Sequence, residues 1–137
     1  MDKLEYIPGD LVKFATNYYT IVNFEENFPH NKICYGLIST NSTKTAFVAD
    51  RDILPIPLTP EILEKNGWVK DTHRHCLDEM PAEAYEKKNF PLTHFNVTFG
   101  KKRIQASHDC LFVRNLKYVS DLQHLLFGLG LNSEMEV

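Results

Sequence analysis

The side chains best suited to chemistry lie in a basic stretch between residues 87 and 117. This stretch carries seven Lys and Arg residues against a single acidic residue, although the whole chain has a net charge of −3. Clustered cations and amides are the groups that contact the phosphate oxygens of nucleic acids. The candidate nucleic-acid contacts are Lys101, Lys102 and Arg103 at a predicted turn, and Gln105 on the strand that follows. The same stretch also contains Lys87, Lys88, Arg114 and Lys117.

A charged hairpin tip is the competing interpretation of these cations, because natural sheets use charge to deter pairing at exposed edges. Acidic segments flank the basic stretch, with a net charge of −5 over residues 50–86 and −3 over residues 118–137. We expect them to pack close to the cations and to weaken their field within the screening length of about 8 Å. Phe95 and Phe99 alternate toward the core, so no platform for stacked bases is predicted.

A second candidate is the run that contains His73, His75 and Cys76. Imidazole and thiolate are zinc ligands, and alternate positions of an extended segment point the same way. A structural zinc site needs about four ligands, and no second pair with ligand spacing occurs in the chain. We therefore favour a polar surface loop and predict no metal and no other cofactor, although the question of metal binding at these three residues stays open.

A third candidate is the adjacent set Ser107, His108, Asp109 and Cys110. Catalytic triads are assembled in space rather than in sequence, and strand alternation places Ser107 and His108 on opposite faces. The chain has no nucleophile elbow, phosphate-binding loop, dinucleotide glycine pattern or zinc-protease motif. The sequence therefore predicts no catalytic residues and a protein that is not an enzyme.

The elements that must position these residues begin with four or five short strands in the first 58 residues. Turn signals separate the strands at fairly even spacing, which is typical of a small antiparallel barrel or meander. Pro8-Gly9-Asp10 directly before the first strand indicates an SH3-like barrel. The predicted strands cover residues 11–14, 18–24, 33–40, 44–49 and 53–56.

A short helix is predicted to begin after Thr59, which is a suitable N-cap, with Pro60 at the first helical position. Gly67 is placed to end this helix in a left-handed conformation. We expect Trp68 to anchor the helix to the barrel. Residues 69–83 are predicted to form an irregular connection.

The clearest hairpin joins residues 95–99 to residues 102–106 through a turn at Gly100-Lys101. This turn pairs Phe99 with Lys102 and places Val97 opposite Ile104. The predicted buried face of the hairpin consists of Phe95, Val97, Phe99, Ile104 and Ala106.

A further short strand is predicted at residues 111–113, and helical spacing of apolar residues predicts a final helix over residues 118–131. Ser120 and Gln123 are placed to form a capping box, and Gly130 to end the helix. The fold class is therefore α+β: an SH3-like barrel-type N-terminal half, a short helix, a second antiparallel hairpin region and a C-terminal helix.

Length and composition limit the class of protein. A chain of 137 residues, 43% of them hydrophobic, is typical of one globular domain. Within residues 1–137 we expect a β-barrel-like subdomain at 1–58 and a hairpin-plus-helix subdomain at 84–131, joined by 59–83. No window approaches the roughly 20 apolar residues of a membrane span, and residues 1–5 lack a signal-peptide core. Three sparse cysteines indicate reduced thiols, so we expect a cytoplasmic protein with no membrane partner.

Two segments resemble recurrent sequence patterns. Residues 53–63, ILPIPLTPEIL, with Gly67-Trp68 after them, are similar to a PIPLT-x-E-x-L…G-[FW] stretch. Residues 118–127, YVSDLQHLLF, are similar to a Y-V-H-x-L-Q-N-L-Y-F C-terminal helix, with Ser120 in place of the usual His and Leu126 in place of the usual Tyr. Both patterns occur, in this order, in a family of short uncharacterised bacterial proteins often linked to phages and mobile elements. The resemblance implies one domain and an intracellular location, and it brings no activity or catalytic residues.

Two functions remain after these exclusions. The first is a non-enzymatic binding or accessory module, linked by resemblance to phages or mobile elements, with a protein partner. The alternative is a nucleic-acid-binding module that uses residues 87–117. The sequence names neither the ligand nor the oligomeric state.

Overall fold

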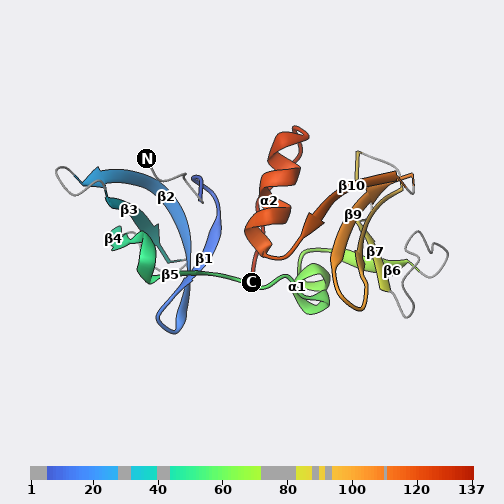
Figure 1. The fold of residues 1–137 in the computed structure, drawn as a ribbon, viewed down its shortest axis with the longest axis horizontal. Coiled ribbons are helices and arrows are strands. Elements are labelled where there is room, and N and C mark those ends of the chain that lie inside the picture. Colours follow the sequence, from blue (N-terminus) through green and yellow to red (C-terminus); the bar gives the residue numbers. More distant parts are fainter. Residues whose placement is uncertain are drawn as a thin grey trace.

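The strands of this chain form two separate antiparallel sheets with a helix between them (Figure 1). The computed structural model describes residues 6–27, 32–39, 44–71, 83–87, 90–91, 94–109 and 111–137. Within these residues each sheet has five strands, and two α-helices follow the fifth and the tenth strand. The predicted α+β class is confirmed. No helix among the described residues is long and apolar enough to cross a membrane.

The first sheet is open and has the strand order β4-β3-β2-β1-β5. Strands β1 to β4 form a meander, and β5 returns to pair with β1 at the edge opposite β4. Ile7-Pro8-Gly9-Asp10 forms the turn before β1, closed by a bond from the Asp10 N–H to the Ile7 carbonyl, with Gly9 at φ +98°. The ladder ends at β4 and β5 without joining them, so the structure does not confirm an SH3-like barrel. The elements are β1 (Leu11–Phe14), β2 (Asn17–Asn27), β3 (Lys32–Ile38), β4 (Ala46–Ala49), the 3-10 helix η1 (Asp50–Asp52) and β5 (Ile53–Pro55).

One face of the first sheet carries its own small core. Alternate residues of its strands are buried there, as the period of two in a strand requires. The ring of Tyr6 meets the ring of Tyr35 edge-on, at 5.5 Å between centroids. The buried residues are Tyr6, Val12, Ile21, Tyr35, Leu37, Val48 and Ile53.

The second sheet has the strand order β10-β9-β8-β7-β6. The sequence predicts an irregular connection over residues 69–83. That prediction is wrong for residues 69–71, which belong to β6, and for Glu83, which begins β7. The remaining residues of that connection, 72–82, lie outside the described part of the chain. The elements are β6 (Trp68–Asp71), β7 (Glu83–Lys87), β8 (Phe95–Phe99), β9 (Ile104–His108) and β10 (Leu111–Leu116).

The hairpin of β8 and β9 has the predicted buried face but not the predicted register. Phe99 pairs with Ile104, and Val97 with Ala106. The N–H of Gly100 donates to the carbonyl of Arg103 at 2.9 Å, so the turn is centred one residue later than expected. The register is shifted by two residues, and a shift of two keeps every side chain on its face.

A larger core lies between the second sheet and the two helices, α1 (Pro60–Lys65) and α2 (Val119–Gly128). Thr59 caps α1 as predicted, since its Oγ1 accepts the Ile62 N–H at 3.3 Å. Trp68 is buried as expected but begins β6 and packs beside Phe95, so it belongs to the second core and not to the first sheet. Leu11 of β1 is the only first-sheet strand residue among the buried members of this core, which are Leu11, Ile56, Leu58, Leu63, Trp68, Tyr85, Phe95, Val97, Ala106, Leu116, Val119, Leu122, Leu125 and Leu126.

The start of α2 is fixed by Asp121 and not by the predicted capping box of Ser120 and Gln123. Asp121 Oδ2 accepts the backbone N–H groups of Tyr118 at 2.8 Å and of Lys117 at 3.0 Å. Residues 117–119 also pair with the segment that leaves the first sheet, because Leu58 N donates to Lys117 O and Val119 N to Ile56 O.

Gln123 serves instead to attach α2 to the first sheet. Its Oε1 accepts the N–H of Leu11 at 2.9 Å, while Nε2 donates to the carbonyls of Gly9 at 3.0 Å and Ser133 at 3.1 Å. The side chain is 2% exposed. The carboxamide therefore connects the sheet, the helix and the C-terminal segment in a site closed to water.

A buried carboxyl adjoins this connection. Asp10 Oδ2 lies 2.6 Å from His124 Nε2 and accepts the N–H of Ile7 at 2.9 Å. Burial raises the pKa of Asp10 above its usual value, and the bonds from Ile7 and His124 offset the shift only in part. The pair therefore orients α2 on the first sheet more than it stabilises the fold at neutral pH.

We predict that Gln123→Ala lowers the free energy of unfolding by about 1–3 kcal/mol, because the buried N–H of Leu11 loses its acceptor. Phe127→Ala is the control on the same helix, since Phe127 is 66% exposed and its loss should change stability by less than about 0.5 kcal/mol. Urea unfolding of both variants checks the comparison. Equal stability of the two would contradict the role of Gln123.

We also predict a pH dependence from Asp10. Above the unfolded value of 3.8 and below its raised folded pKa, the folded chain holds a proton that the unfolded chain has lost. Stability from this group therefore falls as pH rises through the folded pKa. Denaturant titrations at several pH values give the free energies of unfolding of the wild type and of Asp10→Asn. The wild-type value minus the variant value should decrease as pH rises across this window. A difference that grows with pH would refute the assignment.

Candidate nucleic-acid interface

Antiparallel pairing of β9 and β10 brings two separated basic segments together. Leu116 at the end of β10 pairs with Ile104 at the start of β9. The hairpin tip before β9 and the residues around the end of β10 therefore meet beside the start of α2. A groove of about 590 Å³ lies at this meeting point, lined by Gly100, Lys102, Arg103, Ile104, Arg114, Asn115, Leu116, Lys117 and Asp121.

Four of the nine lining residues are cations and one is an acid. Asp121 turns one carboxylate oxygen toward the backbone N–H groups at the start of α2, as described above. Lys117 Nζ lies 5.3 Å from the centroid of the Tyr118 ring, within the range of a cation–π contact. The lining therefore has a net positive charge, concentrated in one concave site.

The acidic segments lie close to the groove but contribute little to its lining. Of the acidic residues of segments 50–86 and 118–137 that the structure describes, Asp121 alone lines it. Glu61, Glu64 and Glu83 gather instead around Tyr85, where burial first and these carboxylates second raise the pKa of the phenol. Glu61 and Glu64 lie on α1, whereas Glu83 lies on β7 and pairs with Phe99, which in turn pairs with Ile104 of the lining. This acidic group is therefore separated from β9 by one strand, at the same end of the second sheet as the groove.

The four sequence-predicted contacts divide into two pairs. Lys102 and Arg103 line the groove, whereas Lys101 is exposed at the turn outside the lining. Gln105 is half-buried within β9, opposite Thr98, and is also outside the lining. The four predicted contacts do not include Arg114 and Lys117. A prediction that β9 pairs with β10 would have identified them, because this pairing places both residues beside the hairpin tip.

The edge strand β10 exposes three consecutive apolar side chains before its basic end. Leu111 is 72% exposed and Phe112 is 60% exposed, and Val113 follows them. A bulge between Phe112 and Arg114 interrupts the ladder with β9. Bulges and charges at an edge disfavour the addition of another strand, so this edge is suited to contacts through side chains.

The other sequence candidates do not assemble into sites among the described residues. Ser107 is buried and paired with Asn96, while His108 is paired with Phe95 on the other face. The imidazole of His108 lies 3.6 Å from Asp109 and is not joined to Ser107. His73, His75, Cys76 and Cys110 lie outside the described residues. Within the part of the chain that is described, no group of His, Cys, Asp and Glu is arranged to hold a metal.

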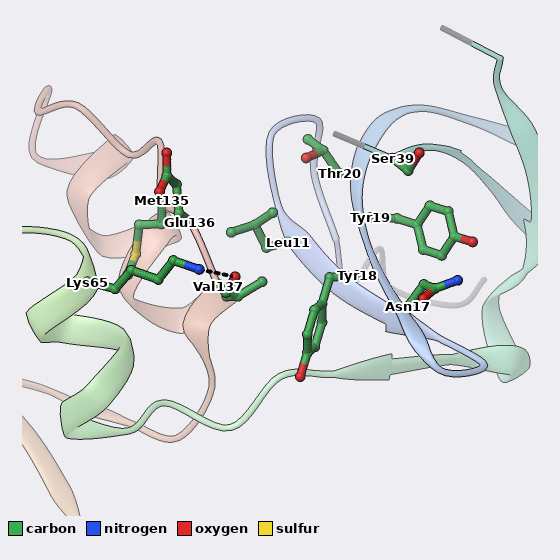
Figure 2. Close-up of a pocket in the computed structure, with 10 residues that line it drawn as sticks. All are labelled: Leu11, Asn17, Tyr18, Tyr19, Thr20, Ser39, Lys65, Met135, Glu136 and Val137. Atoms are coloured by element: carbon green, nitrogen blue, oxygen red, sulfur yellow. Dashed lines mark hydrogen bonds between the residues drawn. The ribbon is translucent and has the colours of Figure 1, made fainter. Parts of the chain in front are cut away.

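A second hollow lies between the first sheet and the C-terminal segment (Figure 2). Tyr18 and Tyr19 form its sheet side, and Lys65 with residues 135–137 forms the other. The amine of Lys65 donates to the Val137 carbonyl at 2.8 Å, and Asn66 exchanges two hydrogen bonds with the backbone of Glu136. The side chains of Lys65 and Asn66 thus bind the chain's own C-terminal segment.

No protein family model, curated protein or solved structure matches the chain.

We predict that Asp121→Asn tightens the binding of a nucleic acid to this groove. The amide oxygen can still accept from the start of α2, while the repulsion of phosphate is removed. The gain should be about fivefold or less, since two unit charges about 4 Å apart in water interact by about 1 kcal/mol. Fluorescence anisotropy with a labelled oligonucleotide measures it, and unchanged or weaker binding would count against the groove.

Proposed function

We propose that this chain is a non-enzymatic binding module whose basic groove holds phosphate groups of a nucleic acid. The observation that carries the proposal is the convergence of Lys102, Arg103, Arg114 and Lys117 in one hollow. A charged hairpin tip requires cations at the turn alone. Here cations from two separate segments line one concave site, so a charged tip does not account for Arg114 and Lys117.

The types of cation suit phosphate. Arginine presents a planar fork of donors that can bind two phosphate oxygens at once, and lysine adds a mobile point charge. The groove contains two of each. Because the whole chain has a net charge of −3, long-range attraction is weak and the affinity must come from this local site.

The salt dependence of binding tests the proposal. The logarithm of the affinity for duplex DNA should fall with the logarithm of salt concentration by about 0.9 for each phosphate contacted. We expect Arg114→Ala with Lys117→Ala to weaken binding to every sequence and to reduce this slope. Anisotropy titrations at several salt concentrations measure both quantities.

The control is Lys13→Ala with Lys70→Ala, which removes the same charge from residues outside the groove lining. This variant should keep the wild-type slope, and Lys101→Ala should have a smaller effect than Arg114→Ala. Equal losses in all variants would show a nonspecific charge effect, and a wild type that binds no nucleic acid would refute the proposal.

A protein partner is the second candidate. It is supported by large apolar side chains that the first sheet leaves exposed, among them Phe24, Phe47 and Leu54. The four-strand meander, with η1 before a fifth strand that pairs with β1, is also compatible with an SH3-like half, although the sheet is open. The resemblance to phage- and mobile-element-linked proteins supports an accessory role within the cell.

A further inference from the structure

We infer that the basic groove binds a phosphomonoester, such as the 5′-phosphate end of a nucleic-acid strand, in preference to the phosphodiesters within a strand. This inference rests on the proposed function and adds the class of phosphate that the site selects. The shared chemistry is a terminal phosphate group, whether at the end of a strand or on a small polyphosphate.

The arrangement of the cations is the first reason. Proteins that bind a duplex along its length contact about 6–10 phosphates, which are spaced by about 1.7 Å of helix axis. Here the four cations line a single hollow. Four cations around one hollow are suited to one highly charged group more than to a line of singly charged ones.

The boundaries of the basic site are the second reason. Toward the start of β10 the cations give way to the exposed apolar residues Leu111, Phe112 and Val113. Beside the start of α2 the lining ends at Asp121. Within the described residues around the groove, the positive surface is therefore short along β10.

The charge of the ligand is the third reason. A phosphomonoester carries about −1.5 to −2 at pH 7, whereas each phosphodiester of a strand carries a single negative charge. The additional charge meets several cations at once, so its effect is larger in this hollow than on an open surface. The volume of about 590 Å³ also lies in the range of about 300–1,000 Å³ that small ligands occupy in proteins.

The experiment compares two single-stranded oligonucleotides of one sequence, labelled at the 3′ end, with either a 5′-phosphate or a 5′-hydroxyl. Anisotropy at fixed ionic strength gives both affinities. We expect the phosphorylated strand to bind about fivefold tighter or more, as an added charge of about −1.5 to −2 close to the cations implies. Inorganic tripolyphosphate should displace the phosphorylated strand, which distinguishes recognition of the phosphate from recognition of the strand.

Arg114→Ala should remove most of this preference, and Lys117→Ala should reduce it. Lys70→Ala, at a position outside the groove, should retain the full ratio between the two strands. Melting temperatures of the three variants show whether each remains folded, and the ratio of affinities does not depend on the folded fraction of the sample.

The outcomes separate this inference from the proposed function. Equal affinity for both strands, with a groove-dependent salt slope, would refute the preference for a terminal phosphate and leave nucleic-acid binding in place. Binding of neither strand would refute both. Displacement by tripolyphosphate without any difference between the strands would also overturn the inference, because it would show general anion binding only.

Discussion

The carboxamide of Gln123 is the contact on which the arrangement of the two sheets depends. The first sheet closes a small core on one of its faces, and Leu11 extends from it into the larger core of the second sheet. Polar contacts must therefore fix the remaining geometry between the two parts. Gln123 does so by using both its acceptor and its donors on backbone groups of two other segments, at Gly9 and Leu11 and at Ser133. Because directional bonds to backbone define an orientation, they position α2 more closely than apolar packing alone does.

The groove depends on the same helix. Residues 117–119 pair with residues 56–58, and Asp121 then binds the backbone at positions 117 and 118. Lys117 thus lies in a segment held from both sides, and Arg114 lies in the strand just before it. The turn that begins at Gly100 places Lys102 and Arg103 in the lining of the same groove as Arg114 and Lys117. The cations are flexible side chains, but the backbone that carries them belongs to defined elements.

Local signals in the sequence were sufficient for much of this fold. The short helix α1 was predictable because Thr59 and Pro60 at its start and Gly67 after its end act through neighbouring backbone groups. The strands of the first sheet followed from alternation and turns. The buried face of the second hairpin was predictable for the same reason. Its register was not, because Gly100 is compatible with a turn centred at either of two positions and both place the same residues in the core.

The errors concern contacts between residues distant in the chain. Trp68 was assigned to the wrong core because nothing next to it indicates that it begins a strand of the second sheet. Gln123 was assigned to a local cap because its partners, Gly9 and Leu11, are more than a hundred residues away. The groove was half predicted, since Lys102 and Arg103 are adjacent in sequence, whereas Arg114 and Lys117 join them only through the pairing of β9 with β10.

The bulge beside Arg114 has a consequence for how this chain behaves at high concentration. An outer strand with Leu111, Phe112 and Val113 in solvent is a template on which identical chains can stack into fibres. The kink breaks the regular spacing that stacking requires, and the guanidinium next to it makes neighbouring copies repel. Arg114 therefore contributes to the solubility of the chain, whatever ligand the groove takes. A neutral, β-branched residue at this position would remove the repulsion and favour self-association through the apolar strand.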